Sequence, residues 1–150
     1  MRIRQMFMED VPAVANIEKE CFSSPWSESA FADAVKDKNA IFFVAEEAGT
    51  VTGYIGMYVS PPEGEITNVA VAENFRNRGC GKKLLCAMQN WAGDNGITRI
   101  VLEVRSSNDA AVHVYLGAGF YTLGVRKNFY QFPREDADIM EWQQNRKEIC

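Results

Sequence analysis

The chain has 150 residues, 47% of them hydrophobic, and its 20 acidic and 16 basic side chains give a formal charge of −4. This length and composition fit one domain with its own core, and they argue against disorder and against a small disulfide-dependent fold. No apolar run approaches the roughly 20 residues needed to cross a bilayer, and the acids in the N-terminal MRIRQMFMED come too early for a signal peptide. We therefore expect one cytoplasmic domain over residues 1–150, without a membrane segment.

The basic residues do not form a stripe with interleaved aromatic side chains, so direct nucleic-acid binding is not expected. A mildly acidic surface instead favours encounter with a basic peptide or protein. We expect the chain to be a monomer.

The four cysteines lie far apart, and no two of them form a C-x-x-C pair. Their spacing is therefore not that of a disulfide framework or of a zinc site. We expect reduced thiols. The chain has one histidine, His113, and metal sites normally draw on several convergent ligands, so no metal is expected. A Ser-His-Asp or Cys-His nucleophile system would depend on that same histidine.

Hydrophobic periodicity predicts an alternation of helices and strands along the whole chain. Helical spacing is found at about residues 10–22, 27–35, 82–95 and 108–117. Seven strands are predicted at Ile3–Met6, Ile41–Glu47, Val51–Ser60, Glu65–Val71, Ile97–Arg105, Tyr121–Lys127 and Asp138–Trp142. The second and third strands read as a hairpin, and a loop is expected at Phe132-Pro133-Arg134.

Helix starts are indicated by small polar residues that can accept hydrogen bonds from free backbone N–H groups. Asp10, Ser27 and either Ser107 or Asn108 are the candidate N-caps. Trp26 lies in the connection between the first two helices, where a large aromatic is either a core plug or a wall of a substrate site.

Two strands have alternating faces that matter for function. The first alternates Ile66, Asn68 and Ala70 against Thr67, Val69 and Val71. The other alternates Ile100, Leu102 and Val104 against Val101, Glu103 and Arg105.

The stretch ENFRNRGCGKKLL joins the first of these strands to a helix. Gly79 and Gly81 have no side chains, so several backbone N–H groups can converge on an anion at the helix N-terminus. The segment does not fit the nucleoside-triphosphate loop, because only one residue separates the glycines and Lys83 stands in place of Ser or Thr. It does not fit the dinucleotide loop either, because Leu84 stands in place of the third glycine. Nearby basic side chains add positive charge: Arg76, Arg78, Lys82 and Lys83. The loop is therefore either a pyrophosphate cradle of another type or a solvated helix start.

The order of the motifs around this loop favours a pyrophosphate cradle over a solvated helix start. The motifs come in a fixed series: the strand EITNVAV, the pattern R-x-x-G-x-G, a helix, a strand, and then N-x-x-A-x-x-x-Y ahead of G-F. This series resembles the GNAT acetyltransferases. The segments FSSPWSESAF, LEVRSSNDAA, YLGAGF and PREDADIM extend the resemblance to the GNAT enzymes that acetylate the N-terminal alanine of a bacterial ribosomal protein. The resemblance implies an α/β fold: a mixed, mostly antiparallel sheet with helices on both faces, splayed between the strands ending at Val71 and near Arg105.

It also implies that acetyl-CoA is the co-substrate and lies in that gap, with its pyrophosphate on the glycine-rich loop. The implied contacts are Val69, Ala70, Val71, Arg76, Asn77, Arg78, Gly79, Cys80, Gly81, Lys82, Asn108 and Tyr115. Val71 is the implied backbone donor to the thioester oxygen, where negative charge develops.

Glu103 and Tyr115 match the family's catalytic base and acid. A peptide α-amine has a pKa of about 7.7 to 8.0, so a base such as Glu103 helps to deprotonate it, directly or through water. The phenol of Tyr115 can return a proton to the departing thiolate. Outside the resemblance, a strand glutamate usually faces solvent and a helix tyrosine usually packs against its neighbours.

The thiol of Cys80 lies at a helix N-terminus, where its pKa can fall, and a covalent acetyl-cysteine is conceivable. The family instead transfers acetyl directly within a ternary complex, which leaves Cys80 as a point of oxidation or alkylation.

Three functions remain open from the sequence. The first is acetylation of a protein N-terminal amine, with a ribosomal-protein alanine as the acceptor. The second is the same chemistry on a lysine, a polyamine or a small-molecule amine, because one fold carries many acceptors. The third is a coenzyme-A-binding scaffold that docks through Trp26, Phe129 and Tyr130. The presence of Glu103, Asn108 and Tyr115 argues against this scaffold function.

Overall fold

The computed structural model describes residues 1–144 and contains a seven-stranded sheet in the order β1-β2-β3-β4-β5-β7-β6. The strands are β1 (Arg2–Gln5), β2 (Ala40–Glu47), β3 (Thr50–Ser60), β4 (Glu63–Val71), β5 (Arg99–Arg105), β6 (Tyr121–Gln131) and β7 (Arg134–Gln143). The helices are α1 (Val11–Cys21), α2 (Glu28–Lys36), α3 (Cys80–Asp94) and α4 (Asp109–Gly117), with short 3₁₀ turns η1 (Met8–Asp10) and η2 (Glu73–Phe75). None of the helices in this part of the chain is long and apolar enough to span a membrane.

The predicted elements are confirmed, with shifts of a few residues at their ends. The largest differences are in β6 and β7, which are longer than predicted because they pair up to the short turn at Phe132 and Pro133. The hairpin β2–β3 turns at Ala48 and Gly49, whose positive φ angles of 50° and 81° are those of a tight hairpin turn.

The caps follow the expectation at two helices and depart from it at one. Ser27 Oγ accepts the N–H of Ala30 at 3.1 Å and so caps α2. Asn108, rather than Ser107, caps α4. Asp10 precedes α1, but its side chain makes no cap hydrogen bond.

The Asp10 carboxylate is engaged elsewhere. It accepts the backbone N–H of Phe7 at 2.7 Å and pairs with the Arg4 guanidinium at 2.8 Å. The hydrogen bond and charge of Arg4 hold the pKa of Asp10 below its usual value. Asp10 therefore connects α1 to strand β1, which local sequence rules for caps do not anticipate.

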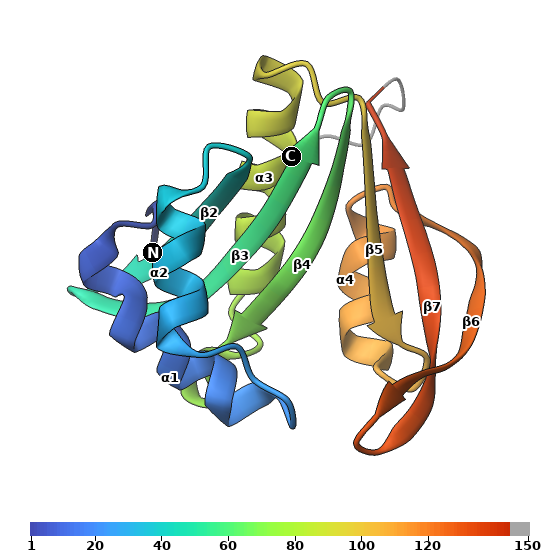
Figure 1. Ribbon diagram of the computed structural model, residues 1–150, viewed down its shortest axis with the longest axis horizontal. Coiled ribbons are helices and arrows are strands. Elements are labelled where there is room, and N and C mark those ends of the chain that lie inside the picture. The colour runs from blue at the N-terminus through green and yellow to red at the C-terminus, as the bar shows by residue number, and fades with distance from the viewer. Residues whose placement is uncertain (145–150) are drawn as a thin grey trace.

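The helices cover both faces of the sheet, as expected: α1 and α2 lie on one face and α3 and α4 on the other (Figure 1). The larger core lies under α3 and α4 and includes Leu84, Met88 and Trp142. The smaller core lies under α1 and α2 and includes Val14 and Phe31. Each face of the sheet is thus buried over most of its area, which is why its central strands are rich in apolar residues.

A bulge in β4 changes the predicted alternation of that strand. Gly56 of β3 pairs with Asn68, but the next residue of β3 pairs with Ile66, so Thr67 is the extra residue. As a result Ile66 packs into the core under α3, whereas Asn68 and Ala70 face α1 and α2. The prediction that Ile66, Asn68 and Ala70 share one face is therefore wrong at Ile66.

The sheet is mixed and splayed, as expected. β4 and β5 are parallel and pair only over Glu63–Glu65 and Arg99–Val101, whereas the other neighbouring strands are antiparallel. Beyond these residues β4 and β5 diverge toward their C-terminal ends (Figure 1).

The cysteines differ from one another. Cys21 and Cys80 have free thiols, while Cys86 is disulfide-bonded, so the expected reduced state is wrong for Cys86. Cys150 lies outside the described residues.

Candidate active site

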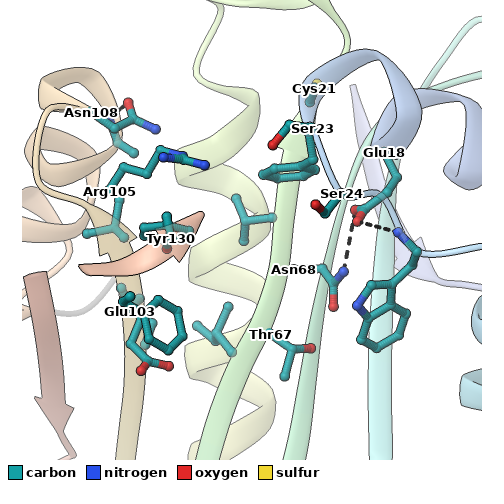
Figure 2. Close-up of a pocket in the computed structure, with 18 of the residues that line it drawn as sticks. Glu18, Cys21, Ser23, Ser24, Thr67, Asn68, Glu103, Arg105, Asn108 and Tyr130 are labelled. Atoms are coloured by element: carbon teal, nitrogen blue, oxygen red, sulfur yellow. Dashed lines mark hydrogen bonds between the residues drawn. The ribbon is translucent and has the colours of Figure 1, made fainter. Parts of the chain in front are cut away.

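A cavity of about 690 Å³ opens where β4 and β5 separate. The end of α1 and the segment joining it to α2 form one wall, while β5, α4 and the β6–β7 turn form the other (Figure 2). Polar and aromatic side chains on its surface include Glu18, Cys21, Trp26, Asn68, Glu103, Arg105, Asn108, Tyr115 and Tyr130. The splay of the sheet therefore creates one continuous site from segments that are far apart in the sequence.

The two walls touch at one end of the cavity. Ser23 Oγ, in the α1–α2 connection, donates a hydrogen bond to the carbonyl of Phe132 in the β6–β7 turn at 2.5 Å. Both loops present exposed aromatic rings beside this contact, Phe22 at 41% and Phe132 at 65% exposure.

Glu103 lies on β5 with its side chain in the cavity lining (Figure 2). The alternation of β5 is as predicted: Leu102 and Val104 are buried in the core and Glu103 projects from the other face. Its carboxylate accepts a hydrogen bond from Arg126 of β6, and the pair is partly exposed. This residue is thus a partly exposed carboxylate with a cationic partner.

Tyr115 lines the same cavity from α4. Its ring packs against Phe120 with centroids 5.8 Å apart and is 8% exposed. Burial raises the pKa of the Tyr115 phenol, with a smaller contribution from Tyr130. Because this pKa is raised, the hydroxyl keeps its proton at neutral pH. It makes no hydrogen bond to any part of the chain that the structure describes, so it is available as a donor.

Asn108 also lines the cavity. Its Oδ1 accepts the N–H of Ala111 at 3.2 Å, which leaves the side-chain NH₂ group to face a ligand. Asn108 and Tyr115 therefore reach one cavity, as their spacing along the helix suggested.

The backbone of β4 offers N–H groups along the gap. Ala72 N–H donates to the carbonyl of Thr52, and hydrogen-bonded pairs alternate along an antiparallel ladder. Val69 pairs with Ile55, and Val71 pairs with Gly53. Both are therefore non-hydrogen-bonded pairs, in which the N–H group of the β4 residue points away from β3 and toward the gap. Ala70 lies between them, with its side chain buried under α1. Val69 and Val71 are thus the residues of this segment with free backbone donors.

The glycine-rich loop forms the N-terminus of α3 at the end of β4. Gly79 has φ +79°, and a methyl group placed at Gly79 or Gly81 would meet no atom within 4 Å. The first bond of the helix is from Lys83 N–H to the Gly79 carbonyl, so the N–H groups of the first turn, through Lys82, have no intrahelical acceptor. This open helix start fits a pyrophosphate, because free donors and the helix dipole favour an anion.

The basic side chains of the loop are not all directed at that helix start. Arg76 donates from Nε to the Val71 carbonyl at 3.0 Å and from Nη2 to Cys21 Sγ at 3.1 Å. Arg78 pairs with Glu47 at 3.4 Å, whereas Asn77 and Lys82 are exposed. Arg76 therefore braces the end of β4 against α1 rather than extending toward the loop.

Cys80 does not present its thiol to the loop. The side chain is 2% exposed and lies 3.9 Å from Thr52 Oγ1. Burial raises the pKa of the Cys80 thiol, which is the opposite of the change expected at an open helix start. Its backbone N–H remains part of the first turn, but the expected point of oxidation or alkylation is not accessible.

Trp26 has both of the roles considered for it. Its ring packs against Phe31 with centroids 5.2 Å apart, and it also lines the cavity. Arg105 stacks over Tyr130 at 4.3 Å and pairs with Glu135, so this tyrosine is held at the cavity surface from the β6 side.

Glu18, Asn68 and Arg126 lie at the site but were not predicted from the sequence as site residues. A signal existed for two of them: an asparagine inside a strand is unfavourable, and Glu18 falls on the apolar side of α1 next to Ile17. No group of three or more His, Cys, Asp or Glu side chains within residues 1–144 is placed to hold a metal ion.

Comparison with known proteins shows the family of the chain. Residues 11–120 match the model of the acetyltransferase (GNAT) family, which is more than two thirds of the chain. The chain belongs to the GNAT acetyltransferase family. It is therefore an acyltransferase whose acetyl donor is acetyl-CoA, as expected from the R-x-x-G-x-G loop and its neighbours.

Relatives within the GNAT family cover nearly the whole chain. The ribosomal protein bS18-alanine N-acetyltransferase of Escherichia coli K12 is 32% identical over 133 residues, which are 87% of this chain and 89% of that protein. The N-alpha-acetyltransferase RimI of Mycobacterium tuberculosis is 31% identical over 137 residues, 87% of this chain and 85% of that protein.

Solved structures of the family share the fold. The crystal structure of the E. coli ribosomal-protein-S18-alanine N-acetyltransferase has a TM-score of 0.88 at 30% identity, covering 97% of this chain and 95% of that one. Ard1 from Thermoplasma volcanium has a TM-score of 0.86 at 26% identity, covering 95% of this chain and 96% of that one. The chain thus shares its overall fold with these two enzymes.

Proposed function

We propose that this GNAT enzyme transfers the acetyl group of acetyl-CoA to the α-amine of a protein N-terminus, and that its acceptor is the N-terminal alanine of a small-subunit ribosomal protein. The observation that supports the chemistry is that one cavity is lined by Glu103, Tyr115 and Val69, a β4 residue whose backbone N–H points away from β3. The names of relatives that match over most of the chain support the choice of acceptor. The proposal includes one domain over residues 1–150, because a single sheet carries both walls of the site.

In this mechanism each residue has one task. The loop at Gly79 and Gly81 and the NH₂ group of Asn108 hold the donor, and the backbone N–H groups of Val69 and Val71 align its pantetheine arm and thioester oxygen. Glu103 accepts the proton of the attacking amine, directly or through water. The nitrogen bonds to the carbonyl carbon, the carbon–sulfur bond breaks, and Tyr115 gives its proton to the leaving thiolate.

The direct route is favoured over an acetyl-cysteine. A nucleophilic thiol must be exposed and ionised, but Cys80 is buried and its pKa is raised. The two remaining groups, a carboxylate and a protonated phenol, fit a single transfer step in a ternary complex.

The acceptor is tested with a set of peptides that share one sequence and differ in the first residue. Each is incubated with the enzyme and acetyl-CoA and analysed by mass spectrometry. We expect the peptide that begins with alanine to react fastest, and the same peptide with a formylated N-terminus and an internal lysine not to react. Comparable acetylation of the formylated peptide would move the acceptor to a lysine. Binding of acetyl-CoA without transfer to any peptide would support a scaffold.

A further inference from the structure

Glu18 is a carboxylate in the cavity wall opposite Glu103 (Figure 2). It lies in the second half of α1 and is 3% exposed. No salt bridge to Glu18 occurs within residues 1–144. A buried carboxylate without a cation is unusual, because a buried charge is normally paired.

Three donors from three parts of the fold hold this carboxylate in place. The Tyr54 hydroxyl of β3 and the Asn68 side chain of β4 donate to Oε1, the latter at 3.4 Å. The backbone N–H of Trp26 donates to Oε2 at 3.0 Å. A carboxylate has about four acceptor positions, so one remains for a further donor. Glu18 is therefore held in place by three donors and has one acceptor position unused.

Asn68 adds a second unused acceptor beside it. Asn68 is 5% exposed and lines the cavity, and its Oδ1 has no hydrogen-bond partner among the described residues. The amide orientation is set by Glu18, because turning the amide over would place Oδ1 against a carboxylate oxygen that can only accept. An unsatisfied buried acceptor is destabilising, so a donor is missing at this position.

The other charges of the cavity are already compensated. Glu103 pairs with Arg126, and Arg105 pairs with Glu135. Arg76, which reaches Cys21 one turn after Glu18, is bound to that thiol and to the Val71 carbonyl. The uncompensated charge of the cavity thus lies at Glu18.

We propose that Glu18 and Asn68 form a cation subsite that receives the acceptor's N-terminal amine in its ammonium form. This inference rests on the proposed function. An ammonium group carries three donors and no acceptor, so one N–H can bind Glu18, a second can bind Asn68 Oδ1, and the third remains for the base. With a pKa of about 7.7 to 8.0, the amine enters mainly as ammonium at neutral pH. Glu18 binds and orients it, and Glu103 removes its proton afterwards.

The test compares two peptides that differ only at the α-position. One begins with alanine and the other with a lactyl group, which replaces the amine by a hydroxyl. Their affinities are measured by calorimetry in the presence of coenzyme A, which permits no transfer. For the wild type we expect the alanyl peptide to bind about tenfold more tightly, the equivalent of about 1.4 kcal/mol for a charge-assisted contact. In Glu18→Gln this ratio should fall to about one.

Two further variants separate recognition from folding. Asn68→Ala removes the unused acceptor without touching the contact between Tyr54 and Glu18, and should lower the ratio several-fold. Glu20→Gln removes an exposed carboxylate of the same helix and should keep the wild-type ratio. An unchanged ratio in Glu18→Gln and Asn68→Ala, or equal weakening of both peptides, would overturn the subsite. Acetylation of the alanyl peptide by the wild type is measured separately, so a failed subsite is distinguishable from a failed function.

Discussion

Arg126 of β6 donates a hydrogen bond to the carboxylate of Glu103 on β5, across the intervening strand β7. The strand register explains the reach, because Arg126 lies opposite Ala137 and Glu103 lies opposite Ile139 on the two sides of β7. The Glu103 carboxylate, which we propose as the base, is therefore oriented by an edge strand and has a cationic partner, whereas Glu18 on the opposite wall has none within residues 1–144. This difference fits the two roles that we propose for these carboxylates.

Glu103→Gln should keep the hydrogen bond from Arg126 and lose the base. We expect turnover of an alanine-starting peptide to fall by about 10² to 10⁴ at pH 7, with the KM for acetyl-CoA unchanged. Because the free amine has a pKa near 8, solution deprotonates it at higher pH and the deficit should shrink by pH 9. Steady-state rates across this range check the prediction, with Glu20→Gln as the control. A deficit of the same size at pH 7 and pH 9 would contradict the assignment of Glu103 as the base.

Tyr115→Phe removes the proton donor but keeps the ring in its packing against Phe120. We expect kcat to fall by about 10² or more while the KM values change little, because the phenol acts on the leaving thiolate. Burial raises the pKa of Tyr115, so the wild type should show no loss of rate from this group as pH rises toward 10. A wild-type activity that declines below pH 9, and a variant that lacks this decline, would show that the phenol ionises too early for this role.

Gly81→Ala tests whether the loop at Gly79 and Gly81 binds the pyrophosphate of acetyl-CoA. A methyl group at Gly81 meets no atom of the protein, and alanine is the better helix former, so stability should rise by about 0.5 to 1 kcal/mol. The same methyl group would stand where the pyrophosphate approaches the helix start, and the affinity for acetyl-CoA should fall about tenfold, or about 1.4 kcal/mol. Calorimetry and urea unfolding measure the two effects.

Gly117→Ala is the matched control for this change. It also lies in a helix with open space around it, but at the far end of α4. It should leave acetyl-CoA binding unchanged. Equal affinities for the wild type and Gly81→Ala would place the pyrophosphate elsewhere.

Because of Tyr54, the free energy of unfolding should decrease at alkaline pH. Burial, and then the Glu18 carboxylate, raises the pKa of Tyr54, so the folded state favours the neutral phenol. Its contribution is complete below the unfolded pKa of about 10 and is lost as pH rises above it, by about 1.4 kcal/mol per pH unit. Urea unfolding between pH 9 and 11.5 should show a smaller slope for Tyr54→Phe than for the wild type. Identical slopes would contradict the shift.

The sequence was sufficient for much of the fold because its periodicities are local. The hairpin at Gly49, the cap at Ser27 and the loop at Gly79 depend on neighbouring residues, and each is found as predicted. The resemblance to the GNAT family added the splayed sheet and the positions of Glu103 and Tyr115, which no local pattern indicates.

What the sequence did not predict depends on contacts between distant segments. The bulge at Thr67 moves Ile66 to the other face, and it is defined by pairing with β3 rather than by local residues. Glu18 is buried because Tyr54 and Asn68, from strands far along the chain, supply its donors. The side chain of Asp10 binds Arg4, which precedes it in the chain by six residues, instead of capping its own helix, and rules for helix caps do not include this contact.

The most direct test of the central claim locates the acetyl group on one peptide that begins with alanine and contains an internal lysine. The peptide is incubated with acetyl-CoA and the wild type, Glu103→Gln or Tyr115→Phe, and the product is read by tandem mass spectrometry. We predict acetylation at the α-amine alone, formed much more slowly by both variants. Acetylation on the lysine side chain, or α-acetylation at the wild-type rate in both variants, would contradict the account.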